Sequence, residues 1–586
     1  MTNHKPRRSL QFDLPHQFQR QQPPTHTPRT MNENDLTLSG TRAGTGNEVF
    51  GIDLGTTYSA IAWLDQNGKP ETLANIDGSP TTPSVVYFES PDNIVVGETA
   101  KEMIPQEPNR VVSFIKREMG NSAYAFETPD GQSYSPIEIS GFILKKLVKD
   151  AEAKTGSPVK NVVITCPAYF GTDEHRATKE AGKYAGLNVL KILNEPTAAA
   201  FAYGIKESEP QTVMVYDLGG GTFDVTIIRV KEDGIEVVAT GGDSTLGGKD
   251  WDAAFVDLLA NKWREATGEE TDILADATFK AELMAVAEKN KKFLSTKDKV
   301  KVRIAPPDGT SKQVEVTREE FDAATAGLLE STIVAARSTL ADAATKTGVE
   351  TFEFDTLLCV GGSSIMPQVA ARLEREFGKT PKLEDPHECV AKGAAVFAGL
   401  HALGSEGGPE DGDGGENPPP GPIVDDILSK SYGIVAGRKG PDGKPEEVVY
   451  NLLLRNQRLS TATHSHVFKT QASNQRTIKF RVTESESGCW ENAKAADPAA
   501  GKEDGQNRIE AMDEDLVNVI QSAEMALPPD LPEGEPVEVT YFVDPKDYVL
   551  YITGILQKTG EKIEIRCDGV GVKVPDEPMP EGINIE

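Results

Sequence analysis

One short motif occurs twice in this chain, and the repeat constrains the fold more than any other feature. Residues 53–57 read Asp-Leu-Gly-Thr-Thr, and residues 217–222 read Asp-Leu-Gly-Gly-Gly-Thr, 164 positions later. Each copy follows an apolar run, residues 50–52 and 213–216, that predicts a β-strand. A single copy has an ordinary alternative, a tight hairpin, but two copies in matching contexts indicate a duplication. The repeat therefore predicts two similar half-domains, each opening with a strand, a Gly/Thr turn and a second strand, that face each other across a cleft.

The residues of the two loops suit a phosphate group bound with a metal ion. Glycine lets the backbone approach a phosphate and present amide donors, and threonine hydroxyls add further donors. Asp53 and Asp217 are expected beside the phosphates. Two carboxylates there repel a polyphosphate unless Mg²⁺, keeping several of its waters, lies between them. The predicted phosphate contacts are Gly55, Thr56, Thr57, Gly219, Gly220, Gly221 and Thr222.

A third glycine-rich stretch does not have the spacing of a Walker loop. Gly247-Gly248-Lys249 lacks the required glycine spacing and has no Ser or Thr after the lysine. A glycine pair in a turn describes it better. We expect Gly247 and Gly248 to close over the phosphate from the second half.

The chain of 586 residues divides into parts of different composition. Strand-like runs alternate with amphipathic helical stretches in the larger part, which indicates an α/β architecture. A Gly-, Pro- and acid-rich stretch then predicts an extended linker, and the short β-rich segments after it predict an antiparallel sandwich. The predicted parts are a disordered tail over 1–47, the α/β domain over 48–403, the linker over 404–425, the β-sandwich over 426–574 with an insertion near 484–515, and a tail over 575–586.

The net charge disfavours two classes of partner, and the cysteine spacing disfavours disulfide and zinc frameworks. The net charge is −30, from 61 basic and 91 acidic residues, which disfavours non-specific binding to nucleic acid or to anionic lipid. No apolar run reaches the length of about 20 residues that spans a membrane. The five cysteines are scattered and never in CxxC spacing, which favours a reducing cytoplasm over a disulfide framework or a zinc site.

Four motifs in order closely resemble the seventy-kilodalton heat-shock chaperone family. They are GIDLGTTYS at 51–59, NEPTAAA at 194–200, DLGGGTFDV at 217–225 and VGGSSIMP at 360–367. The resemblance implies a duplicated actin-like ATPase domain that binds ATP or ADP with Mg²⁺. It continues more weakly to about residue 571, which implies the family's β-sandwich peptide-binding domain.

The same resemblance implies the catalytic roles. Asp53 and Asp217 would hold the Mg²⁺, mostly through water, and Glu195 and Asp224 would join the network around metal and water. Lys116 would orient the attacking water. Electrostatic stabilisation of this kind is what phosphoryl transfer needs from a protein. For Lys116 taken alone, a solvated helix face is the alternative.

Nucleoside contacts are implied on a helix over residues 279–294 and on the loop near 361–365. Lys292 stands where the family has an adenine-stacking arginine, Ile365 replaces the arginine across the base, and His387 replaces an aspartate. Without the planar guanidinium groups we expect looser binding of ATP or ADP. The implied contacts are Tyr58, Glu288, Lys291, Lys292, Ser295, Gly361, Gly362, Ser363 and Ile365.

Communication between the two domains is expected to be weak. Pro167 and Arg176 match the residues that, in the family, relay the nucleotide state to the peptide-binding domain. The family's linker segment that docks on the ATPase domain corresponds to residues 423–426, which contain two aspartates and follow a long Gly/Pro/acidic stretch. Ile478 matches the central apolar peptide pocket and Val449 a flanking position, and ordinary sandwich core is the alternative for both. No segment resembles the family's helical lid, so we expect brief peptide retention.

These observations favour an ATP-dependent chaperone that hydrolyses ATP slowly and binds exposed apolar polypeptide segments. The implied co-chaperones are a J-domain protein and a nucleotide exchange factor. One alternative is a nucleotide-switched scaffold with negligible hydrolysis and a dedicated partner. Another is a small-molecule kinase, which shares the duplicated fold but gives no reason for a fused sandwich.

Overall fold

The computed structural model describes most of the chain after residue 47. Parts of three predicted segments lie outside the described residues: the tail over 1–47, linker residues 406–422 and insertion residues 486–508, which include Cys489. The described residues are 48–204, 210–231, 234–307, 309–405, 423–439, 444–485, 509–513, 517–545, 548–567, 574–575, 578–580 and 582–586.

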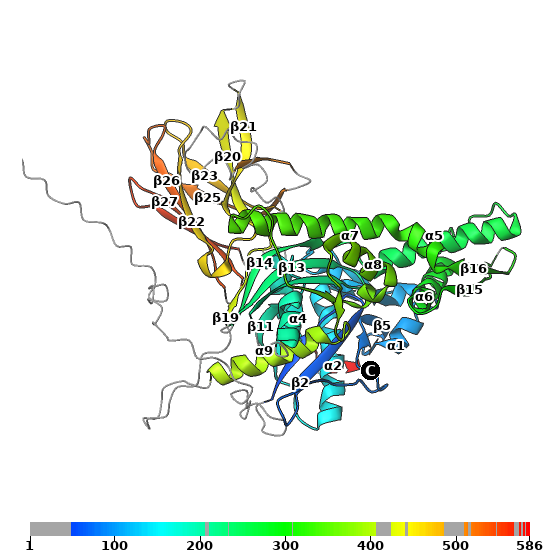
Figure 1. Cartoon of the computed structure of the whole chain (residues 1–586). Coiled ribbons are helices and arrows are strands. Elements are labelled where there is room, and N and C mark those ends of the chain that lie inside the picture. Colours follow the sequence, from blue (N-terminus) through cyan, green and yellow to red (C-terminus); the bar gives the residue numbers. More distant parts are fainter. Residues whose placement is uncertain are drawn as a thin grey trace, which may run out of the picture. The chain divides into compact units, whose positions relative to one another are not determined.

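Two sheets of matching topology form the centre of the N-terminal part (Figure 1). The first has the order β11-β10-β1-β2-β3 and the second β18-β17-β12-β13-β14-β19. In each, the opening strand pairs antiparallel with the next strand and parallel with a later one. This is the arrangement that the repeated motif predicts. The strands are β1 Val49–Asp53, β2 Tyr58–Leu64, β3 Pro70–Thr72, β10 Asn161–Cys166, β11 Asn188–Asn194, β12 Gln211–Leu218, β13 Phe223–Lys231, β14 Gly234–Asp243, β17 Thr356–Val360, β18 Lys382–Leu383 and β19 Ile423–Asp425.

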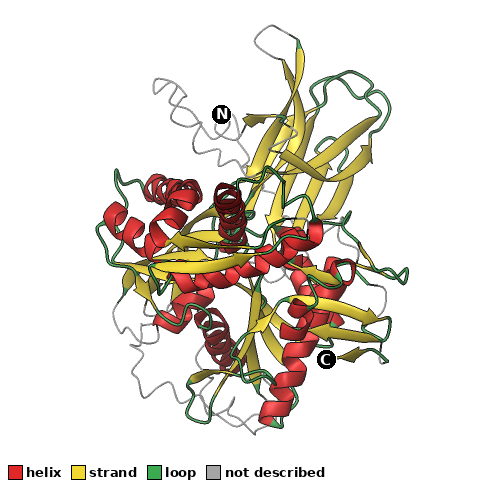
Figure 2. Ribbon diagram, turned by 90° about the vertical axis from the view of Figure 1, so that its right-hand side faces the viewer, coloured by secondary structure: helices red, strands yellow, loops and turns green. Residues whose placement is uncertain are grey.

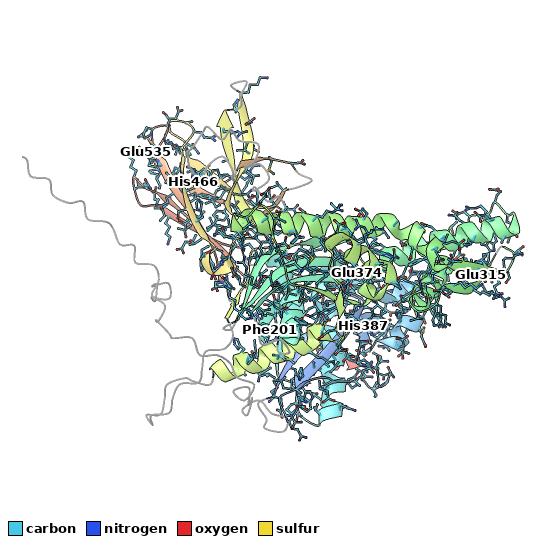
Figure 3. The ribbon with its side chains drawn as sticks, in the orientation of Figure 1. Phe201, Glu315, Glu374, His387, His466 and Glu535 are labelled. Atoms are coloured by element: carbon cyan, nitrogen blue, oxygen red, sulfur yellow. The ribbon has the colours of Figure 1, made fainter. Side chains whose placement is uncertain are left out.

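A pair of helices lies between the two sheets. Helix α4 packs on β12 and β13, helix α9 packs on β1 and β2, and the two helices pack on each other. Phe201 of α4, labelled in Figure 3, lies 5.4 Å from Phe397 of α9 between ring centres. The small side chains of α4 (Glu195–Gly204) and α9 (Cys389–Ser405) allow this close approach. The buried alanine and valine residues of this core on the two helices are Ala198, Ala199, Ala200, Val390, Ala394 and Ala398.

Further helices cover the outer faces of the sheets. Helix α2 begins with a capping box of Ser135 and Glu138, and α7 begins with one of Thr317 and Glu320, so both starts are encoded locally. Helix α7 packs on β13 and β14, while α5 and α6 form an outer layer with a hairpin of β15 and β16. These elements are α2 Pro136–Thr155, α3 Thr172–Tyr184, α5 Gly248–Thr267, α6 Ala277–Leu294, β15 Lys299–Ile304, β16 Lys312–Thr317, α7 Arg318–Thr347 and α8 Pro367–Phe377.

The C-terminal part consists of two antiparallel sheets over one apolar core. Their orders are β24-β21-β20-β23-β25 and β22-β26-β27-β28, and Figure 2 shows them as strands joined by loops. Tyr432, Phe480 and Tyr541 are fully buried between them. The strands are β20 Ser431–Lys439, β21 Pro445–Leu453, β22 Thr463–Lys469, β23 Thr477–Ser485, β24 Ile509–Ala511, β25 Val517–Ala526, β26 Pro536–Val543, β27 Leu550–Leu556 and β28 Lys562–Cys567.

Three predicted boundaries differ from the structure. Helix α9 continues to Ser405 and β19 begins at Ile423, so both ends of the predicted linker are regular elements. Strand β23 runs to Ser485, and β24 lies inside the predicted insertion. Residues 584–585, predicted as tail, form strand β29 in a sheet of order β29-β6-β5-β7. The other strands of this sheet are β5 Val85–Ser90, β6 Asn93–Val96 and β7 Val111–Ser113. Strands of two or three residues are too short to show an alternating pattern, and their pairing is decided by distant partners.

No helix in the described ranges is long and apolar enough to cross a membrane.

Candidate functional site

The two Gly/Thr loops meet inside a cleft between the two sheets. Residues 54–57 join β1 to β2, and residues 219–222 join β12 to β13. The loops are so close that a Cβ atom added at Gly220 would overlap the hydroxyl of Thr57. They line a cavity of about 870 Å³, a volume suited to a cofactor-sized ligand.

The third glycine-rich stretch lies against the second loop, as the start of helix α5. The amide of Gly248 donates to the carbonyl of Gly219 at 3.0 Å, and the amide of Lys249 donates to Gly220 at 2.8 Å. Gly248 lines the cavity, while Gly247 packs behind it against the backbone of Gly221. The positive end of the helix dipole therefore faces this region, which favours an anion.

Arg117 contacts both the second Gly/Thr loop and the start of helix α5, and this role was not predicted. Its Nε donates to the carbonyl of Gly221 at 2.7 Å, and its Nη2 donates to Thr245 at 2.9 Å. It also pairs with Asp250 at 3.2 Å. The signal available in the sequence was its position next to Lys116.

Lys116 and Glu195 form an ion pair in the wall of the cavity. The lysine ammonium contacts Glu195 Oε1, and the side chains are only 5% and 9% exposed. Burial acts to lower the pKa of Lys116, but the neighbouring Glu195 and Asp53 carboxylates outweigh it and raise that pKa. Lys116 is thus held positively charged at the cavity.

Phe114, two residues before Lys116, has an unusual backbone conformation. Phe114 precedes the short helix η2 (Ile115–Glu118) with φ at 61°, in the left-handed region. Such a conformation is uncommon for an aromatic residue and concentrates at functional sites. Phe114 also lines the cavity.

Asp53 lies at the end of β1, facing the same ion pair. The hydroxyl of Thr165 donates to its Oδ1 at 3.0 Å. Burial and the charge of Glu195 raise the pKa of Asp53 to about 7, although Lys116 and Thr165 act in the opposite direction. A cation beside Asp53 would oppose this shift, because an opposite charge favours the carboxylate form.

Two more aspartates extend this cluster. Asp217 and Asp224 are register partners across β12 and β13. Burial and the charge of Glu195 raise the pKa of both carboxyls well above the usual range. Asp217 lines the cavity, whereas Asp224 is 1% exposed and lies behind it, accepting a bond from the Ala168 amide at 3.1 Å.

This cluster has an excess of carboxyl groups that a divalent cation would offset. Among the described residues, no three His, Cys, Asp or Glu side chains converge closely enough to hold a metal ion by themselves. Mg²⁺ commonly binds proteins through one or two carboxylates and keeps several of its waters. The buried hydroxyl of Thr57 lacks a hydrogen-bond partner, which a phosphate oxygen would supply. The residues thus fit both Mg²⁺ and a phosphate group.

The opposite wall of the cavity is one face of helix α6. Glu288, Lys291 and Lys292 line it, and Ser295 caps the helix. Lys291 donates to the Gly248 carbonyl at 2.7 Å. The helix therefore presents the predicted residues on one face, with Lys291 joined to the phosphate loops.

Tyr58 is the centre of a charged cluster on this wall. The ammonium groups of Lys101 and Lys292 donate to its hydroxyl at 2.9 and 3.0 Å. Both also pair with Glu288 at 2.7 Å. Burial acts to raise the pKa of Glu288, but the two lysines outweigh it and lower that pKa to about 2. Lys101, which joins the two halves of the cleft, was not predicted.

The last wall is the turn after β17. Gly361 has φ at 81°, and an added Cβ atom would overlap the Leu218 carbonyl, so a side chain there is excluded. Gly362, Ser363 and Ile365 line the cavity, with Ile365 38% exposed. His387, labelled in Figure 3, lies against Gly362 and also lines it.

The segment predicted to dock weakly is paired in this structure. Strand β19 extends the second sheet by pairing with β14. Arg458 of the C-terminal part contacts both Glu236 and Asp425. The buried carboxylate of Asp426 accepts two bonds from the Asn194 amide, at 3.0 and 2.9 Å. Polar contacts of the two aspartates accordingly add to the packing of Val424 against the apolar core.

The predicted relay residues lie near this contact. Pro167 is buried in the loop after β10, and Arg176 is half-buried on α3. The preceding residue, His175, stacks on Tyr548 with ring centres 4.0 Å apart. Tyr548 in turn donates to Asp426 at 2.8 Å. His175 was not predicted, because its partners come from distant parts of the chain.

The two predicted peptide-binding residues have different surroundings. Val449 is fully buried in β21, and Ile478 is half-buried in β23 against the apolar core. Their roles stay predictions.

Comparisons with known proteins agree with this geometry. The family model described as "Hsp70 protein" matches residues 49–496. The chain is 44% identical over 367 residues to the protein named "Chaperone protein DnaK" from Thermotoga neapolitana, and equally similar to those of Thermotoga petrophila and Thermotoga maritima. Each match covers 61% of this chain, and the chain spans about 60% of the length of these relatives.

Proposed function

This chain belongs to the Hsp70 protein family, and from that premise we propose that it is an ATP-dependent molecular chaperone. The observation that carries the proposal is the single cavity on which two matched phosphate loops, an ion-paired lysine and buried carboxyl groups converge. In this proposal, residues 48–403 are an actin-like ATPase domain and residues 426–574 a β-sandwich that binds peptide.

The residues at the phosphate end have distinct roles in ATP hydrolysis. Bound Mg²⁺ would neutralise phosphate charge during transfer. Asp53 and Asp217 would hold the hydrated ion, with Asp224 supporting them from behind. Lys116, kept charged and oriented by Glu195, would position the attacking water and stabilise charge on the phosphoryl oxygens.

The loops hold the phosphate and the helix wall holds the nucleoside. The backbone amides near Gly55 and Gly220, together with the hydroxyl of Thr57, would bind phosphate oxygens. Lys292 and Ile365 line the cavity, at the two positions where the resemblance implies arginines that stack on the base. We therefore infer that ATP and ADP bind less tightly here than to a site with two arginines.

Coupling of hydrolysis to peptide binding would run through β19 and Asp426. These residues join the ATPase part to the C-terminal sheets, and Pro167 with Arg176 would relay the nucleotide state to them. A nucleotide shifts the docking equilibrium only through a difference in affinity for the two states. Ile478 is proposed to contact an extended apolar peptide held by main-chain hydrogen bonds, with Val449 at a flanking position of that pocket.

The proposed partners are unfolded polypeptides, a J-domain protein and a nucleotide exchange factor. A cytoplasmic location is part of the proposal. Cys166, Cys359 and Cys389 are buried free thiols, which suits a reducing compartment.

Single-turnover ATP hydrolysis, measured with and without an unfolded polypeptide, tests the proposed function. We expect slow hydrolysis that the polypeptide accelerates. Hydrolysis without acceleration would leave an ATPase that lacks chaperone coupling. No hydrolysis in the presence of Mg²⁺ would contradict the proposal.

A further inference from the structure

The segment at residues 582–586 extends a sheet of the N-terminal part. Strand β29 (Asn584–Ile585) pairs in parallel with β6 (Asn93–Val96). The amide of Asn584 donates to Asp92 at 2.9 Å, the amide of Glu586 donates to Ile94 at 3.0 Å, and the amide of Val96 donates back to Glu586 at 2.8 Å. Figure 1 marks this end of the chain near β5, α1 (Glu98–Glu102) and α2.

Side-chain contacts reinforce this pairing. Ile585 is 5% exposed and belongs to the apolar core of the N-terminal half, and Met579 and Ile583 pack against that core. The Lys149 ammonium on α2 donates to the Ile585 carbonyl at 2.7 Å. The side-chain amide of Asn584 donates to Oδ1 of Asn93 at 2.8 Å. Ile585 thus acts as an apolar anchor between polar contacts.

The β6 edge would be open without this segment. Strand β6 pairs with β5 on its other side, so β29 covers its remaining edge. An uncovered edge presents unpaired amide and carbonyl groups that recruit another strand. Removing Ile585 would also uncover part of the apolar core. The edge therefore has both features of a site that binds an extended peptide: main-chain hydrogen bonds and a side-chain pocket.

The segment also forms a second connection between the two parts of the chain. Strand β28 ends at Cys567 in the C-terminal sheets, and 16 residues separate it from Asn584. A stretch of that length spans at most about 60 Å when fully extended. While β29 is paired, the C-terminal sheets are tethered at both ends, by the linker before β19 and by this stretch.

We propose that the β6 edge is a peptide-binding site for an extended segment with an apolar anchor, and that residues 582–586 occupy it as an intramolecular latch. The latch keeps the C-terminal sheets near the ATPase part and raises the effective concentration for docking through β19. The pairing itself does not depend on the proposed chaperone activity, so it is tested without nucleotide.

Hydrogen exchange at Val96 tests the latch directly. In the unchanged full chain this amide is expected to be protected, because it donates to Glu586. Ile585→Asp places a charge in the apolar core, and we expect at least about tenfold faster exchange over residues 93–97. Pro580→Asp adds the same charge at an exposed position just before this segment and should leave the protection unchanged.

Binding in trans tests the site itself. A fluorescent peptide with the sequence of residues 578–586 should bind, by fluorescence anisotropy, to a variant lacking residues 574–586 and at least about tenfold more weakly to the full chain. A peptide with Asp at the Ile585 position should not bind. If the deletion variant does not fold, the Ile585→Asp full chain serves as the receptor.

Three results would overturn the proposal. One is fast exchange at Val96 in the unchanged chain, or exchange that Ile585→Asp does not alter. Another is failure of the peptide to bind once the segment is removed. The third is a dimer, measured by light scattering, that the deletion converts to monomer, because the occupant would then be the segment of a second copy.

Discussion

The ammonium group of Lys116 contacts the carboxylate of Glu195 across a cavity wall formed by residues 79 positions apart in sequence. Each group is buried, so neither would be stable as a charge there without the other. This pairing keeps the lysine charged and oriented, which is the property that a role in phosphoryl transfer requires.

The first prediction concerns that lysine. Lys116→Ala should lower single-turnover ATP hydrolysis by about a hundredfold or more, because a contact made in the transition state is lost. ATP affinity should stay within about tenfold. The exposed Lys145→Ala on α2 is the control and should hydrolyse ATP normally. Unchanged turnover in Lys116→Ala would remove this residue from the catalytic set.

The second prediction compares two glycines. Gly220→Ala should abolish nucleotide binding in calorimetry, because its Cβ atom would overlap Thr57. Gly327→Ala on α7 meets no neighbouring atom within 4 Å and should stabilise the fold by about 0.5–1 kcal/mol. Normal ADP binding by Gly220→Ala would show that the two loops do not form the phosphate site.

The third prediction concerns the adenine pocket. Changing both Lys292 and Ile365 to Arg should tighten ADP binding several-fold, since two planar cations would stack on the base. Val334→Arg adds a charge at a similarly exposed apolar position on α7, where Val334 is 56% exposed, and should have no effect. Equal ADP affinities of the double variant and the unchanged protein in calorimetry would mean that the base binds elsewhere.

The fourth prediction is that the contact between the C-terminal sheets and the N-terminal part depends on pH. Glu174 on α3 and Glu484 on β23 both approach Gly171, and Lys430 pairs with Glu484 at 3.3 Å. Burial and repulsion from Glu484 raise the pKa of Glu174 to about 7. A carboxyl with a raised pKa stabilises the contact in its protonated form, so docking should weaken as pH rises from about 4.5 through about 7.

Small-angle scattering of the full chain measures this effect. The radius of gyration should be larger at about pH 8 than at about pH 5.5. Glu174→Gln is neutral at every pH and should give the compact value in both buffers. A pH response that persists in Glu174→Gln would assign the titration to another group.

The sequence by itself determined the two Gly/Thr turns that line the cavity. The two Asp-Leu-Gly motifs encode strand, turn and strand locally, so their pairing as β1 with β2 and β12 with β13 follows from short-range pattern. Helix α6 could be placed within two residues at its start, because the Asp276 cap and the apolar spacing are local signals.

Only the tertiary structure decided which distant groups meet. Arg117 contacts Gly221, His175 stacks on Tyr548, and β29 pairs with β6. No local pattern names the distant partner in any of these contacts, although Arg117 lies next to the predicted Lys116. Hydrogen bonds and ring contacts between distant segments depend on how the whole core packs, and that packing is a sum over many residues. The same reason explains why a segment with two aspartates can dock, since Arg458 reaches Asp425 and Asn194 reaches Asp426 only in the folded chain.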